Sequence, residues 1–118
     1  AVSKLIGNYD MTTSGAPNDG MMMLTGGPGF WYLNSSKTAL LIHADIVNFI
    51  AKGHFVQTSN NVTQLGLIGG HAYSVLGAYT LSNGVKLIQV RNPWGYGEWT
   101  GAYNDNDAFW TNNPTMAT

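Results

Sequence analysis

His71 and Asn92 form the pair of side chains in this sequence with the clearest catalytic potential. The oxygen of an asparagine amide accepts the proton of one imidazole nitrogen and thereby fixes the tautomer and orientation of the ring. The other ring nitrogen is then available to a nucleophile, as a base or as an ion-pair partner. Because asparagine adds no charge, the pair suits a thiolate–imidazolium couple, whose nucleophile is already acidic. The alternative is a strand histidine satisfied by backbone groups or solvent.

Whether the two side chains meet depends on a predicted β-hairpin. Residues 71–79 alternate like a strand, the Ser-Asn-Gly sequence at 82–84 is typical of a hairpin turn, and 85–91 is the returning strand. Since side chains alternate between faces, an even number of loop residues puts His71 and Asn92 on one face. A four-residue loop sets them directly opposite each other, with Cβ atoms about 5 Å apart. A two-residue loop at Asn83-Gly84 offsets them too far for contact.

Hydrophobic spacing predicts one long helix and a further strand. Apolar side chains recur every three or four residues over 36–52, where Ser35 or Ser36 can cap the start and Gly53 suits the end. The other expected segments are the end of a helix over 1–6, stopped by Gly7 and Asn8, a glycine- and proline-rich loop over 10–29, and a short strand over 54–58. Together they predict an α+β fold with an antiparallel sheet and a packed helix.

The composition excludes several functions. The chain has no cysteine, which rules out disulfides, thiolate metal sites and a cysteine nucleophile within it. A net charge of −1 provides no basic face for nucleic acid, and no apolar run is long enough for membrane insertion. Charged residues make up only 9%, against about 25% in an average domain. Either the surface is neutral and rich in Asn, Thr, Ser and Gly, or much of it packs against a partner or another domain.

Two long motifs resemble the second protease-core subdomain of the calpain family. They are GHAYSVLGA at 70–78 and KLIQVRNPWGYGEWTGAYND at 86–105, and the upstream Leu-Thr-Gly-Gly at 24–27 resembles a Thr-Gly-Gly segment of that family in the right order. By this resemblance His71 is the catalytic histidine and Asn92 its orienting asparagine. Trp94 matches a tryptophan that lines the substrate cleft and shields the pair from water. Gly70 matches a glycine that leaves room for the substrate backbone.

The same resemblance implies a calcium site. Glu98 and Asp105 match two carboxylate ligands of the family, and hard oxygen ligands on a glycine-containing loop suit calcium. The family's other ligands come from a second loop that should follow this segment, so the ligand set is incomplete in this chain. Glu98 and Asp105 as solvated loop acids is the alternative. Asp107 is a nearby carboxylate with no match, and His43 and His54 are interpreted as structural.

The resemblance implies a papain-like cysteine protease subdomain, an antiparallel sheet or partial barrel with a packed helix. Residues 1–118 are expected to form a single subdomain, a fragment of a longer chain. Its function would be the His/Asn half of a calcium-dependent, cytoplasmic cysteine endopeptidase acting on polypeptide. It would be inactive alone and complemented by a cysteine-bearing subdomain in the same or a neighbouring chain. The alternative is a non-catalytic calpain-like interaction module in a larger assembly, and a weaker one is a calcium-sensing fold.

Overall fold

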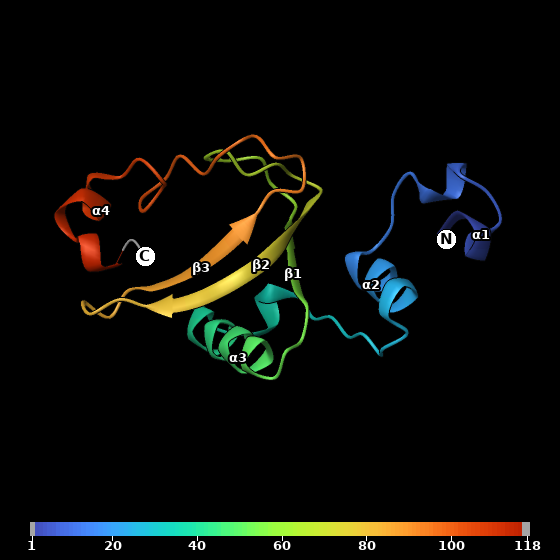
Figure 1. Ribbon diagram of the computed structural model, residues 1–118, viewed down its shortest axis with the longest axis horizontal. Coiled ribbons are helices and arrows are strands. Elements are labelled where there is room, and N and C mark those ends of the chain that lie inside the picture. The colour runs from blue at the N-terminus through green and yellow to red at the C-terminus, as the bar shows by residue number, and fades with distance from the viewer. Residues whose placement is uncertain (1, 117–118) are drawn as a thin grey trace. The chain divides into compact units, whose positions relative to one another are not determined.

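The computed structural model describes residues 2–116, which divide between Ile42 and His43 into two compact units. The elements are α1 (Val2–Ile6), η1 (Asp10–Thr12), α2 (Pro17–Thr25), η2 (Asn34–Ser36), α3 (Ala39–Ala51), β1 (Val56–Asn60), β2 (His71–Thr80), β3 (Lys86–Arg91), α4 (Ala108–Asn112) and η3 (Pro114–Met116) (Figure 1). None of the helices in this described part of the chain has the length and apolar character of a membrane span.

The first unit contains a helix where the sequence predicted a loop. The prediction of a loop over 10–29 is wrong, because η1 and α2 both lie there. Pro17 occupies the start of α2, and Gly26 ends it with φ +69° and an N–H donated to the Met22 carbonyl at 2.9 Å. Proline is tolerated in the first helical turn and glycine is favoured just past the last. The two residues interpreted as loop formers therefore delimit a helix.

Helix α1 ends where the sequence predicted. Gly7 has φ +100° and donates its N–H to the Ser3 carbonyl at 3.0 Å, so the stop predicted at this glycine is confirmed. Ala1, which the sequence assigned to the same helix, lies outside the described residues.

Helix α3 is the predicted long helix, with a later start. Thr38 rather than Ser35 or Ser36 caps it, because the Leu41 N–H donates to Thr38 Oγ1 at 3.4 Å while both serines lie in η2. Its end at Gly53 is confirmed: the Gly53 N–H donates to the Ile50 carbonyl at 2.9 Å and the His54 N–H to the Phe49 carbonyl at 3.0 Å. This pair of bonds is a Schellman motif.

The Schellman motif also explains why β1 begins at Val56 rather than at His54. Since the His54 N–H is bound to the helix end, it is not available to the sheet ladder.

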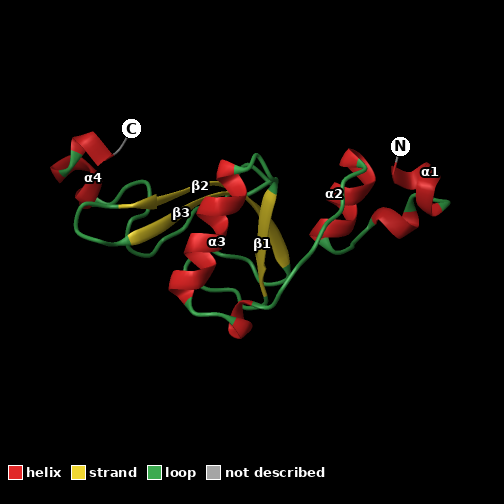
Figure 2. Ribbon diagram, turned by 90° about the horizontal axis from the view of Figure 1, so that it is seen from below, coloured by secondary structure: helices red, strands yellow, loops and turns green. Residues whose placement is uncertain are grey.

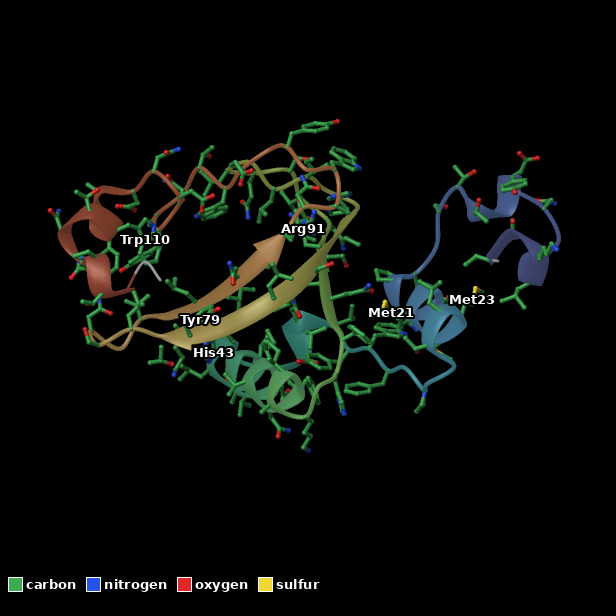
Figure 3. The ribbon with its side chains drawn as sticks, viewed as in Figure 1. Met21, Met23, His43, Tyr79, Arg91 and Trp110 are labelled. Atoms are coloured by element: carbon green, nitrogen blue, oxygen red, sulfur yellow. The ribbon has the colours of Figure 1, made fainter. Side chains whose placement is uncertain are left out.

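The second unit contains an open antiparallel sheet of three strands in the order β1-β2-β3 (Figure 2). The predicted α+β class with an antiparallel sheet is confirmed. Tyr73 and Val75 on β2 are buried, as are His43 and Ile46 on α3. His43 lies beneath the far end of β2 and its Nε2 is 3.0 Å from the Tyr79 carbonyl oxygen (Figure 3). A carbonyl only accepts, so Nε2 donates and fastens the helix to the strand.

Helix α4 was not predicted, because residues after Trp99 show little periodicity. Asp107 is the N-cap: its two oxygens accept the N–H groups of Phe109 at 2.9 Å and Tyr103 at 2.7 Å. Tyr103, Phe109 and Trp110 pack edge to face around this corner. The hydrogen bond from Phe109, followed by the one from Tyr103, lowers the pKa of the Asp107 carboxyl.

The stability that Asp107 gives this corner should depend on pH. Because its pKa is lowered on folding, the contribution is present above the unfolded value of about 3.9 and is lost as the pH falls through the folded value. We expect the Phe109 and Tyr103 amides to exchange faster with solvent over that acidic range. In Asp107→Asn, which keeps one acceptor oxygen without a carboxyl, amide exchange measured by NMR should lose this added acid dependence. An equal acid response in both proteins would contradict the assignment.

Candidate active site

The hairpin that carries the candidate site has a connecting loop with an odd number of residues. Thr80 pairs with Lys86, so residues 81–85 join the two strands. Gly84 takes φ +84° and donates its N–H to the Leu81 carbonyl at 2.8 Å. The turn chemistry predicted for 82–84 is confirmed, but the four-residue loop is wrong. Counted from this turn alone, Asn92 would lie opposite Ser74 and on the face away from His71.

A β-bulge at Leu76 restores the pairing. Val75 pairs with Val90 and Gly77 with Gln89, so Leu76 is an extra residue in β2. Beyond it Ser74 pairs with Arg91, and the following residue, Asn92, comes opposite Tyr73. Tyr73 and His71 are two residues apart and share a face. Asn92 is thus diagonal to His71 instead of directly opposite, still within reach of these side chains.

His71 and Asn92 are hydrogen-bonded, with Nε2 2.8 Å from Oδ1. Two further bonds fix the asparagine amide, because its Nδ2 donates to the Tyr96 carbonyl at 2.8 Å and its Oδ1 accepts the Trp94 N–H at 3.1 Å. The atom facing the imidazole is therefore an acceptor, and Nε2 must carry the proton. In the neutral ring this leaves Nδ1 as the basic nitrogen.

Aromatic rings surround the imidazole. Tyr73 meets it edge-on, with centroids 4.8 Å apart, and Trp94 lies against it at 4.4 Å with the planes tilted by 45°. Tyr96 stacks on Trp94 at 5.8 Å. Tyr73 is buried, whereas Trp94 is half exposed. Such apolar walls lower the local dielectric, which strengthens the hydrogen bond between His71 and Asn92.

Gly70 immediately precedes His71 in a left-handed conformation, with φ +70°. Its N–H donates to the Asn60 carbonyl at 2.8 Å, which joins it to the end of β1. A Cβ added here would meet nothing within 4 Å, so open space lies beside the histidine. Glycine is favoured here because few other residues adopt this backbone conformation.

Comparison with known proteins identifies the lineage. A family model described as "Calpain family cysteine protease" matches residues 1–117. The chain belongs to the calpain family. It is 38% identical to the human calpain-2 catalytic subunit over 93% of its length, 35% to the chicken calpain-2 catalytic subunit over 94%, and 34% to human calpain-12 over 98%. It spans only 17% of the length of each of these relatives.

Within the described residues, the two predicted calcium ligands do not join a group of side chains that could hold a metal ion. Glu98 and Asp105 are both exposed. Among residues 2–116, no three His, Cys, Asp or Glu side chains gather in a way that could hold a metal ion. Calcium prefers six to eight oxygen ligands, so two carboxylates are too few.

The loop before His71 is locked to the loop after Asn92. The Thr100 N–H donates to the Leu65 carbonyl at 2.9 Å, and Gly66, at φ +87°, packs against the Glu98 backbone so closely that a Cβ would overlap its carbonyl oxygen. These two contacts hold the segments that flank the histidine and the asparagine in one place.

We expect Gly66→Ala to cost about 2–4 kcal/mol of stability, because it adds a steric overlap to an unfavourable φ. Gly84→Ala is the matched control: its φ of +84° is similar, but a Cβ there meets nothing within 4 Å. This control should lose only about 1 kcal/mol. Urea unfolding of both variants measures the difference. Equal losses would mean that the close approach to Glu98 contributes nothing.

The other histidines of the calpain chain lie apart from these contacts. His43 is buried and bound to the Tyr79 carbonyl, and His54 is exposed and stacks on Phe49 with centroids 5.9 Å apart. Sequence reasoning overlooked Tyr73 and Tyr96 as parts of the site. The alternation of residues 71–79 already placed Tyr73 on the face of His71, but nothing local indicated that the Tyr96 carbonyl would orient Asn92.

Proposed function

We propose that this chain is the His/Asn half of a papain-like calpain endopeptidase core, with the nucleophilic cysteine supplied by another subdomain of the same or a neighbouring chain. His71 would be the catalytic base and Asn92 its orienting partner. Gly70 and Trp94 would line the cleft for an extended polypeptide. As in the family at large, we propose an intracellular, cytoplasmic location.

One observation carries the proposal: the hydrogen bond from His71 Nε2 to an amide oxygen whose orientation two other contacts fix. It leaves Nδ1 as the nitrogen that can take a proton from a thiol. A histidine present for structure alone, such as His43, instead has its ring fixed by a backbone carbonyl.

The chemistry follows from the tautomer. Nδ1 takes the thiol proton, and the thiolate attacks the peptide carbonyl carbon. The imidazolium then returns the proton to the leaving amine, forming an acyl thioester and the first product. Water attacks the thioester as Nδ1 accepts its proton, which releases the acid and restores the thiol. Asn92 accepts from Nε2 throughout, and the rings of Trp94 and Tyr73 keep bulk water from the ion pair.

The alkylation rate of the proposed cysteine, measured against pH in the full-length protein, tests this role. We expect a thiol pKa well below the ordinary value of about 8.5, because an imidazolium stabilises the thiolate. His71→Gln should return the thiol pKa toward the ordinary value, whereas His54→Gln, at an exposed position, should leave the thiol pKa unchanged. Measurements with calcium and with a chelator show whether calcium is needed, as the family resemblance implies. A thiol that is indifferent to His71 would overturn the proposal.

A second candidate is a non-catalytic interaction module. The chain has no cysteine, and large apolar side chains such as Phe55, at 76% exposure, and Trp31, at 70%, face solvent. Exposed apolar surface favours contact with another subdomain or protein under either function. If the full-length protein carries Ser or Ala where the nucleophile belongs, the module is the better account.

A further inference from the structure

The face on which Asn92 lies is decided by a single extra residue. The turn at 81–85 has an odd number of residues. Without the Leu76 bulge, this turn would place Asn92 on the face of the sheet away from His71. A bulge leaves one residue unpaired, and it persists only where neighbouring contacts favour it over a regular ladder. Whatever holds this bulge therefore also positions the asparagine.

The contacts that could do so lie directly after the bulge. The ring of Tyr79 crosses over Gly77, so closely that a Cβ on Gly77 would overlap the ring and its hydroxyl. The Tyr79 hydroxyl then donates to Gln89 Oε1 at 3.2 Å. Gln89 is the residue that pairs with Gly77 across the two strands. The side chain of one strand thus spans the ladder at the first pair after Leu76.

The backbone of the same tyrosine is held from beneath. His43 donates to the Tyr79 carbonyl from α3, and Figure 3 shows the two residues next to each other where β2 meets the helix. Tyr79 therefore has its main chain fixed by the helix and its ring fixed across the sheet. Sliding β2 by one residue to remove the bulge would break both contacts.

We infer that Gly77, Tyr79 and Gln89 form a register clasp that holds the Leu76 bulge and thereby keeps Asn92 on the face of His71. Gly77 is a positioning residue: it touches no reacting group, but only glycine leaves space for the ring that closes the clasp. This inference rests on the proposed function for its catalytic consequence, whereas its structural claim stands independently.

The test combines Gly77→Ala with Asn92→Ala in the full-length protein. We expect Gly77→Ala alone to reduce kcat for a peptide substrate by about 10²-fold, the effect of a misplaced catalytic group, with a smaller change in KM. In the Asn92→Ala background, Gly77→Ala should reduce kcat by less than about a further 2-fold, because the hydrogen bond between His71 and Asn92 is already absent. Gly53→Ala, at the end of α3, controls for lost stability and should leave kcat unchanged below the onset of melting.

Crystal structures of the variants keep the two proposals distinguishable. In Gly77→Ala the distance from His71 Nε2 to Asn92 Oδ1 should exceed hydrogen-bonding range, whether or not the protein cleaves peptides. If Gly77→Ala does not fold, Gln89→Ala at an exposed position removes the clasp bond instead, with an expected loss in kcat of about 3-fold. A distance that stays at 2.8 Å would overturn the clasp. So would a double variant whose loss in kcat equals the product of the losses in Gly77→Ala and Asn92→Ala.

Discussion

Replacing His71 with glutamine should reduce kcat/KM for peptide cleavage by about 10⁴-fold or more, because a base that acts together with a nucleophile cannot be removed without losing the joint effect. Glutamine preserves a polar side chain of comparable reach and can still contact Asn92, but its amide takes up no proton near neutral pH. The thiol would lose both the acceptor for its proton and the positive charge beside it. Initial rates on a fluorogenic peptide measure the loss.

His54→Gln is the matched control for that experiment. The same substitution is made at an exposed histidine remote from Asn92, so the rate should stay within a factor of about 2 of wild type. Circular dichroism should show that both variants remain folded. A His71→Gln protein that cleaves nearly as well as its control would exclude His71 as the base.

Asn92→Ala should reduce kcat by about 10²-fold and change KM less, since the asparagine orients the base without binding substrate. The variant removes the oxygen that holds Nε2 and leaves the Trp94 N–H and the Tyr96 carbonyl without their side-chain partner. The ring then rotates among orientations of which few point Nδ1 at a thiol. The expected loss is smaller than for His71, because the base itself remains.

The control for Asn92→Ala is Asn106→Ala, which truncates an exposed asparagine in a turn outside the site. It should retain wild-type kcat. A rise in KM with kcat unchanged in Asn92→Ala would contradict the orienting role and indicate that Asn92 contributes to substrate binding instead.

The contact between His71 and Asn92 could be predicted from the sequence, but the strand register that produces it could not. Alternation along 71–79 and a Ser-Asn-Gly turn required an even count between the strands for the two side chains to share a face. The chain reaches that parity with an odd turn plus one bulged residue. No local pattern marks Leu76 as unpaired, because the bulge depends on Tyr79 lying over Gly77, a contact that exists only in the folded sheet.

The residues at the two ends of α2 fitted both a loop and a helix when only the local sequence was considered. Proline and glycine occur in loops as well as at the two ends of a helix, and the nine-residue α2 between Ala16 and Gly26 is short and only weakly apolar. Gly53 was unambiguous, because a longer and far more apolar helical segment precedes it. The calcium ligands could not be judged locally either, since two acids seven positions apart say nothing of the further oxygens that a metal needs.

The contact between Trp94 and His71 gives the site an optical reporter. An excited indole is quenched far more by imidazolium than by neutral imidazole, and only 4.4 Å separates these ring centres. The emission of Trp94 should therefore dim when His71 gains a proton and recover when the proton leaves. Transfer of a proton from a thiol could then be followed in real time in a stopped-flow instrument, with no label attached.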